Sequence, residues 1–315
     1  MQFTLLNAEF LSGCLPAKIE DRDGETGSLK AFISLHRFSL RDLLLDAGAI
    51  LFRGFEIQNA SDFEAFVKHF SGKELFNYAG GTSPRTALDI AGIYTSTEYP
   101  PEIKIPLHNE LSYSSIYPVH VYFCCLRPAD YGGETTLGDS RAILRNLDQN
   151  TVEMFKSRKV RYVRNLGSDK GSGYSWQDAF EADDAPTVEN ICDARGAEYE
   201  WTADGLRISE VRPATAVHPV TGEEVWFNQA EGFHESNVFV DGDRPFGNHL
   251  PRLHSTFGDG SPICRLTLEH VRTVIENETI KHCWKQGDVL VLDNRLAAHG
   301  RMPFQGQREV LVAMT

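Results

Sequence analysis

Apolar residues in the N-terminal part of the chain follow first the spacing of a helix and then that of a buried strand. In SLRDLLLDAG (39–48) they recur on one helical face, with Ser39 placed to cap the first turn and Gly48 to end the last. AILFRGF (49–55) is a continuous apolar run, which is typical of a buried strand. ASDFEAFVKHF (60–70) then returns to helical spacing, so this part of the chain indicates mixed helix and strand.

From about residue 105 onward, short apolar runs alternate with Gly-rich turns, which is the pattern of a sheet-on-sheet or barrel fold. The strand-like runs are VHVYFCCL (119–126), GGETTLGD (132–139), GDVLVLDN (287–294) and REVLVAMT (308–315). Helical spacing returns in SRAILRNLDQNTVEMFKSRKV (140–160) and CRLTLEHVRTVIENET (264–279). We expect a single domain over residues 1–315, mainly β with α decoration: a jelly roll (double-stranded β-helix) with flanking helices.

The segment 168–260 differs from the rest of the chain in its pattern. It is polar, rich in Gly, Asp and Glu, and poorly periodic, so we expect a long insertion with few runs that could form a core. An insertion of this length can fold over a functional site. We therefore predict that residues 168–260 form a lid and substrate-recognition region.

Composition excludes some classes of partner. The net charge of −13 over 315 residues argues against nucleic acid and against an anionic membrane surface. No apolar run approaches the roughly 20 residues of a membrane-spanning helix. The N-terminal residues lack the basic start and apolar core of a secretory signal, and the six cysteines form no C-x-x-C pair. These features indicate a cytoplasmic protein without a membrane or nucleic-acid partner.

His108 and Glu110 in IPLHNELSY (105–113) form the most informative chemical pair, because side chains two residues apart share one face of an extended strand. With one distant histidine they would make the 2-His-1-carboxylate triad of non-haem Fe(II) oxygenases, which leaves coordination positions open. His299 follows a strand-like run and is the candidate for the third ligand. The alternatives are a zinc hydrolase, although the H-E-x-x-H signature is absent, and a jelly-roll binding protein without catalysis.

Arg308 lies nine residues after His299, at the start of the last apolar run. An arginine in this place could hold a carboxylate in bidentate fashion near the metal. The alternative is a surface arginine or one in a salt bridge. Its place at the opening of an apolar run makes that alternative less attractive.

These residues and several further segments resemble the taurine dioxygenase and clavaminate synthase superfamily of Fe(II)- and 2-oxoglutarate-dependent oxygenases. The similarity is greatest to the clavaminate-synthase-like branch that includes the aspartyl β-hydroxylase of syringomycin biosynthesis. The resembling segments cover most of the chain and are GAILFRGF (48–55), GGTSPRT (80–86), PLHNELSY (106–113), RPADYGGETTLGDSR (127–141), VWFNQ (225–229), TFGDG (256–260) and GDVLVLDN…AHGR…R (287–308).

The resemblance implies a role for each matching residue. His108, Glu110 and His299 would hold Fe(II). Thr135 and Arg308 would bind the distal carboxylate of 2-oxoglutarate, with Arg301 as the competing candidate because the His-to-Arg distance is shorter than in taurine dioxygenase. A carboxylate in the second ligand position argues against a halogenase.

The resemblance also implies the reaction and the kind of substrate. O₂ and 2-oxoglutarate would be consumed, succinate and CO₂ released, and a C–H bond of a small amino acid hydroxylated, with the amino acid free or tethered to a carrier protein in a specialised-metabolite pathway. Desaturation, epoxidation or cyclisation are alternative outcomes. Arg85 and Asn228 are the candidates for substrate contacts; a structural salt bridge for Arg85 and a loop hydrogen bond for Asn228 are the alternatives.

Overall fold

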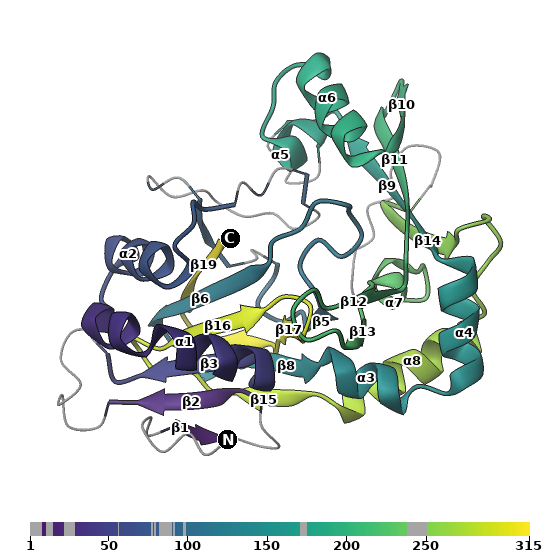
Figure 1. Ribbon diagram of the computed structural model, residues 1–315. Helices are drawn as coiled ribbons and strands as arrows, with labels where there is room; N and C mark the ends of the chain where they lie inside the picture. The colour runs from purple at the N-terminus through teal and green to yellow at the C-terminus, as the bar shows by residue number, and fades with distance from the viewer. Residues whose placement is uncertain are drawn as a thin grey trace.

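Two sheets that face each other form the centre of the computed structural model (Figure 1). The larger has the strand order β1-β2-β3-β16-β6-β19-β4 and the smaller the order β15-β8-β17-β5. Only β2 and β3 pair in parallel among the pairs of these two sheets that the structure describes. The described residues are 8–10, 15–21, 29–55, 57–76, 78, 80–81, 90, 92–96, 99–170, 175–237 and 251–315.

The strands of the larger sheet are β1 (Ala8–Phe10), β2 (Ala17–Glu20), β3 (Ala49–Arg53), β16 (Val289–Asp293), β6 (His120–Arg127), β19 (Glu309–Met314) and β4 (Ile93–Thr95). Those of the smaller sheet are β15 (Ile280–His282), β8 (Thr135–Asp139), β17 (Ala297–Arg301) and β5 (Ile105–His108). This arrangement of facing, mainly antiparallel sheets is the jelly roll that the sequence predicts.

The central strands of the larger sheet are buried on both faces, and this explains their continuous apolar runs. In β6, Val121 and Phe123 belong to the core between the two sheets, whereas Tyr122 and Cys124 pack under the outer helices. The strands β16 and β19 alternate in the same way between the two cores. Side chains that point into the sandwich from these strands form one wall of the functional site.

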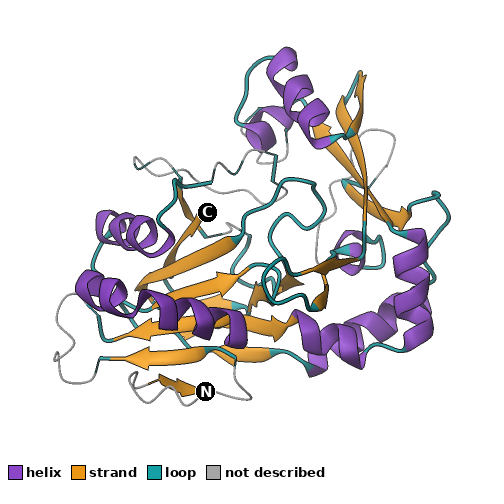
Figure 2. Cartoon of the chain, in the orientation of Figure 1, coloured by secondary structure: helices purple, strands orange, loops and turns teal. Residues whose placement is uncertain are grey.

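Helix α1 (Leu29–Ala47) covers the outer face of the larger sheet (Figure 2). It begins ten residues before the Ser39 start that the sequence indicates, so Ser39 lies inside the helix and that prediction is wrong. The reason is that Phe32 and Ile33 continue the buried stripe of the helix upstream. The predicted end is correct, because Gly48 follows the last helical residue with a φ of 77°.

The remaining helices flank the two sheets. The predicted helix over 140–160 is interrupted at Asp148, whose side chain caps a new helix by accepting a hydrogen bond from the Thr151 N–H at 2.9 Å. The helices are α2 (Ala60–Ser71), α3 (Ser140–Asn146), α4 (Gln149–Arg158), α5 (Trp176–Phe180), α6 (Ala185–Arg195), α7 (Ala230–Phe233) and α8 (Arg265–Asn277).

The segment 168–260 contains regular structure, contrary to its poorly periodic pattern. A third sheet with the order β10-β11-β9-β14 carries α5 and α6 and projects from the sandwich (Figure 1). It has an apolar cluster of its own, in which Phe180 and Val188 from the helices pack on Leu206 and Ile208. The sequence indicates few runs that could form a core, and these few apolar residues nevertheless make a separate cluster.

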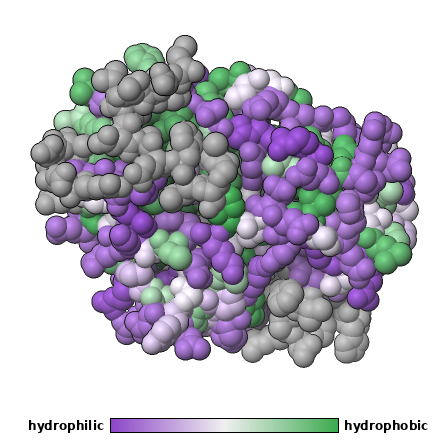
Figure 3. Space-filling model, turned by 90° about the horizontal axis from the view of Figure 1, so that it is seen from below, coloured by the Kyte–Doolittle hydropathy of each residue, from purple (hydrophilic) through white to green (hydrophobic). Residues whose placement is uncertain are grey.

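The strands of this part are β9 (Val160–Gly167), β10 (Glu198–Thr202), β11 (Gly205–Arg212), β12 (Thr215–Val217), β13 (Glu224–Trp226) and β14 (Leu253–Phe257). The short strands β7 (Tyr131–Gly132) and β18 (Phe304–Gln305) pair with each other. The face in Figure 3 is largely hydrophilic, with hydrophobic residues in separate small areas. None of the helices in the described part of the chain is long and apolar enough to cross a membrane.

Candidate metal and co-substrate site

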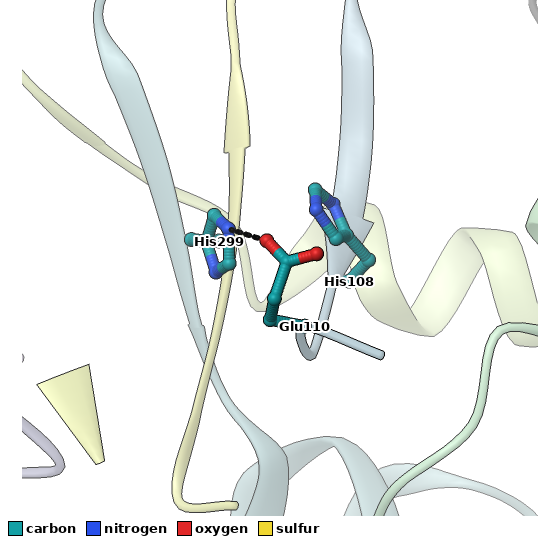
Figure 4. Close-up of side chains that lie close together, drawn as sticks. All are labelled: His108, Glu110 and His299. Atoms are coloured by element: carbon teal, nitrogen blue, oxygen red, sulfur yellow. Dashed lines mark ion pairs between the residues drawn. The ribbon is translucent and has the colours of Figure 1, made fainter. Parts of the chain in front are cut away.

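Three potential metal ligands come together between the strands β5 and β17 (Figure 4). His108 and His299 lie directly opposite each other in the antiparallel β5–β17 pair, so their side chains point to the same face. Glu110 lies in the turn just after β5 rather than within the strand. The predicted pair therefore shares one site, although extended geometry ends at His108.

The ligand atoms of the three residues fit one metal ion. One nitrogen of each histidine and one oxygen of Glu110 all lie within 4.8 Å of one another. The two imidazole rings have centroids 4.4 Å apart, and His299 Nε2 is 3.7 Å from Glu110 Oε2. Two neutral imidazoles and a carboxylate are the donor set of the facial triad, which leaves positions open on the metal.

Neighbouring groups fix the orientation of these ligands. His108 Nδ1 lies 2.9 Å from the carbonyl oxygen of Pro106, which orients the ring so that Nε2 is available for a metal. The ring of Phe123 packs edge-on against His299 at a centroid distance of 5.0 Å. Glu110 and His299 are buried, so a bound ion would be shielded from bulk water on this side.

Thr135 and Arg301 lie beside the triad on the same face of the smaller sheet. Arg301 is opposite Thr135 in the β8–β17 pair, and two residues further along the pair His299 is opposite Leu137. Residues at this spacing share a face, so Thr135 and His299 both point into the sandwich. The Thr135 hydroxyl is buried and accepts a hydrogen bond from Trp284 Nε1 at 3.0 Å.

Arg301 and Arg308 differ in what they bind. Arg301 donates hydrogen bonds to three backbone carbonyls, those of Tyr99, Pro100 and Ile103, at 2.8–3.2 Å. These contacts hold the loop before β5 against β17. Both terminal nitrogens of Arg301 are therefore occupied by the backbone.

Arg308 binds the chain through two of its nitrogens. Its Nε donates to the Gly133 carbonyl at 3.2 Å and its Nη1 to the Ser96 hydroxyl at 3.1 Å. No ion pair joins it to a carboxylate among the described residues, and no hydrogen bond from Nη2 to these residues is found. Burial and the nearby charge of Arg301 lower the pKa of Arg308 to about 10, so it is still cationic at neutral pH.

The half-buried guanidinium of Arg308, which has no carboxylate partner among the described residues, fits an anionic group. The carbonyl that Arg308 binds belongs to Gly133, which precedes Thr135 by two residues. A carboxylate beside Arg308 would supply the missing counter-charge and could accept from the Thr135 hydroxyl as well. The residues present thus fit both Fe(II) and a dicarboxylic co-substrate.

A pocket opens from the triad toward α7 and the loop before β5. It is lined by Tyr99, Ile103, Lys104, Ile105, Pro106, Leu107, His108, Glu110, Tyr113, Gln229, Glu231, Gly232, Phe233 and Leu253. Its walls therefore join the triad to residues of the segment 168–260. An apolar base with a few polar groups is the usual character of a small-molecule site.

Of the two predicted substrate contacts, the structure describes only Asn228. Arg85 lies outside the described residues. Asn228 is buried: its Nδ2 donates to the Ala214 carbonyl at 2.8 Å and its Oδ1 accepts from the Ala230 N–H at 3.0 Å. Asn228 thus joins the connection between β11 and β12 to the start of α7 by backbone hydrogen bonds, as in the loop-hydrogen-bond alternative.

Sequence reasoning missed residues that hold or line the site. Asn294 binds the backbone of Glu110, while Gln229 donates to the Asn109 carbonyl at 2.9 Å and to the Ser112 hydroxyl at 3.1 Å. Glu231 lines the pocket. The segments around Asn294 and Gln229 are among those that carry the resemblance, which is a signal for them; Glu231 has no comparable signal.

Comparison with known proteins gives matches over nearly the whole chain. Residues 15–315 match the profile of the family described as "Taurine catabolism dioxygenase TauD, TfdA family". The dapdiamide synthesis protein DdaC of Enterobacter agglomerans is 33% identical over 96% of this chain and 92% of its own. A clavaminate synthase-like protein of Arabidopsis thaliana is 31% identical over 90% of this chain and 86% of its own.

The fold also matches solved structures. A taurine dioxygenase from Burkholderia xenovorans superposes with a TM-score of 0.59 at 16% identity, and the match covers 98% of this chain and 88% of that one. At this identity the likeness shows the fold alone.

Proposed function

The chain belongs to the TauD/TfdA family of Fe(II)- and 2-oxoglutarate-dependent dioxygenases, and from this premise we propose that it hydroxylates an unactivated C–H bond of a small amino acid or a carrier-bound aminoacyl group. The observation that carries the proposal is the set of three ligand atoms from His108, Glu110 and His299 within 4.8 Å of one another. Desaturation, epoxidation and cyclisation are the alternative outcomes.

The proposed role of the triad is to hold Fe(II). When bound, Fe(II) with 2-oxoglutarate and O₂ supplies the oxidation of the C–H bond, and 2-oxoglutarate leaves as succinate and CO₂. The contact between His108 Nδ1 and the Pro106 carbonyl orients the ring toward the metal. The buried walls around Glu110 and His299 limit the access of water.

Thr135 and Arg308 are proposed to bind the distal carboxylate of 2-oxoglutarate. What supports Arg308 over Arg301 is its lack of a carboxylate partner among the described residues, whereas Arg301 binds three backbone carbonyls. Arg308 is positioned for this role by Gly133 and Ser96, which fix two of its nitrogens. The planar fork of arginine can then present its remaining N–H donors to one carboxylate.

The substrate class rests on the relatives. One relative is named as a dapdiamide synthesis protein, which supports a place in specialised metabolism and an amino-acid-derived substrate. A closer relation to the syringomycin aspartyl β-hydroxylase and a cytoplasmic location stay predictions. Arg85 and Asn228 also stay predicted substrate contacts.

The segment 168–260 is proposed to be the lid and substrate-recognition part of a single domain. Gln229, Glu231, Phe233 and Leu253, which line the pocket, support this role. Residues of this segment also share one apolar core with the two central sheets, which supports a single domain over 1–315.

The test uses oxygen-free protein with Fe(II) and 2-oxoglutarate. We expect a weak visible charge-transfer band, and release of succinate when O₂ is admitted. His108→Ala, Glu110→Ala and His299→Ala should each abolish both while the fold is retained, and His36→Ala on α1 should behave as wild type. Absence of the band at saturating iron and co-substrate would contradict the proposal.

A further inference from the structure

The pocket beside the triad has charged groups of opposite sign on its walls. Glu231 lies on α7 and Lys104 in the loop just before β5, and both line the pocket together with His108 and Glu110. The metal and co-substrate roles described above use neither Glu231 nor Lys104. A small ligand in this pocket would therefore meet Glu231, Lys104 and two residues of the triad at once.

Glu231 is a buried carboxyl with one oxygen engaged. Arg272 Nε donates to Oε2 at 3.2 Å, and its Nη2 donates to the Glu231 carbonyl at 3.3 Å. Within the described part of the chain no hydrogen bond reaches Oε1. Burial raises the pKa of Glu231 although Arg272 and Lys104 act in the opposite direction, so a further cation in the pocket would stabilise the ionised carboxylate.

Lys104 is held by a partner that it can exchange. Its Nζ lies 2.6 Å from Glu276 Oε2, but the Glu276 side chain is 66% exposed. Ion pairs at such exposed positions contribute little to stability. A carboxylate inside the pocket could therefore replace Glu276 as the partner of Lys104 at small cost.

Helix α8 contacts both charged residues of the pocket, Glu231 and Lys104. Arg272 and Glu276 are four residues apart on this helix and so lie on one face. Arg272 holds Glu231, and Glu276 holds Lys104. Helix α8 thus contacts both the anionic and the cationic residue of the pocket walls.

We propose that the pocket recognises an unprotected amino-acid head group, with Glu231 accepting from the ammonium and Lys104 pairing with the carboxylate. The inference rests on the proposed function and deepens it, because it assigns the substrate class to free amino acids. A thioester to a carrier protein leaves the ammonium but removes the carboxylate, so Lys104 would have no partner on a tethered substrate.

The experiment uses calorimetry to measure how tightly amino acids bind to the oxygen-free protein loaded with Fe(II) and 2-oxoglutarate. The probes are the common free L-amino acids, each with its N-acetyl form and its methyl ester. We expect at least one free amino acid to bind, and both of its blocked forms to bind about tenfold to hundredfold more weakly, which is the effect of losing a hydrogen bond to a charged group.

Three variants separate the two contacts. Glu231→Gln should remove the preference over the N-acetyl form, and Lys104→Met the preference over the methyl ester. Glu276→Gln is the matched control, because it removes the ion-pair partner of Lys104 and leaves Lys104 itself in place. The free amino acid should bind to this variant as tightly as to wild type or more tightly.

Failure of this inference can be told apart from failure of the proposed function. If no free amino acid binds while the charge-transfer band and succinate release persist, the head-group assignment is wrong and the oxygenase function stands. Equal binding of free and blocked forms would also overturn it. Absence of the band and of succinate would overturn the proposed function itself.

Discussion

Asn294 holds the main chain of Glu110 from both sides. Its Oδ1 accepts a hydrogen bond from the Glu110 N–H at 2.7 Å, and its Nδ2 donates to the Glu110 carbonyl at 2.9 Å. The two residues are 184 positions apart in the sequence. A side chain at the end of β16 thus fixes the turn that delivers the carboxylate of the triad.

Asn294→Asp should therefore weaken iron binding as well as stability. An aspartate keeps the acceptor but replaces Nδ2, which donates to the carbonyls of Glu110 and Pro118, by a second acceptor. Leaving such buried groups unpaired costs about 1–3 kcal/mol each. We expect a lower melting temperature and a higher Fe(II) requirement, measured by thermal unfolding and by titration of the charge-transfer band.

Asn228→Asp is the matched control for this change. It also removes one buried Nδ2 donor, here to the Ala214 carbonyl, but it lies at the start of α7 and not at the Glu110 turn. It should destabilise the fold with little effect on the Fe(II) requirement. An Asn294→Asp protein with the wild-type iron requirement would show that the turn positions Glu110 without this contact.

Arg308→Lys and Arg301→Lys should change different properties of the protein. A lysine at 308 keeps the charge but loses the fork, so the 2-oxoglutarate requirement should rise about tenfold to hundredfold. A lysine at 301 loses contacts to three backbone carbonyls, so its main effect should be on stability. Titration of the band with 2-oxoglutarate and thermal unfolding measure the two effects; if the effects are exchanged, so are the roles.

The triad could be predicted from the sequence because part of its geometry is local. The two-residue spacing keeps His108 and Glu110 together at the end of β5, although Glu110 lies in the turn and not on the strand. The apolar run that forms β16 predicted His299 just beyond a strand, and the structure places it on the next strand, β17. The partnership of Asn294 with Glu110 could not be predicted, because it depends on how β16 and the turn after β5 meet in space. The resemblance to the family pointed to the segment that contains Asn294, but it did not indicate the contact between Asn294 and Glu110.

The start of α1 and the third sheet were missed for related reasons. Phe32 and Ile33 belong to α1, but the intervening polar residues weaken the apolar stripe when it is read from the sequence. In β11 a buried position is taken by Glu210 and an exposed one by Val211, so the strand lacks a clear alternation of apolar and polar residues. Glu231 has no sequence signal, because its importance comes from the pocket that it faces.

His282 should make the protein sensitive to mild acid. Burial lowers the pKa of His282 to about 4, with the charge of Arg53 adding to the effect and that of Asp288 opposing it. The unfolded chain binds a proton near pH 6.5, so stability present above that pH is lost as the pH falls toward 4. Between pH 7 and pH 5 the loss from this group is about 2 kcal/mol.

Urea unfolding of wild type and His282→Gln at the two pH values measures this effect. Glutamine cannot gain a charge, so the variant should lose less stability between pH 7 and pH 5 than wild type does. His36→Gln on α1 is the comparison for a histidine at the outer surface and should retain the wild-type pH dependence. An unchanged pH dependence in His282→Gln would show that His282 does not carry the acid sensitivity.

The lid proposal for residues 168–260 predicts where substrate changes hydrogen exchange. Gln229, Glu231 and Phe233 on or beside α7 and Leu253 on β14 line the pocket, so a bound substrate should hold these elements closed over the triad. Protein with Fe(II) and 2-oxoglutarate is compared with and without an amino acid that binds, and the increase in protection should concentrate at α7 and β14. The strands β16 and β6 are the internal control, because they are already buried on both faces. Unchanged exchange in α7 and β14 beside a substrate that is turned over would mean that this segment is a fixed wall and not a lid.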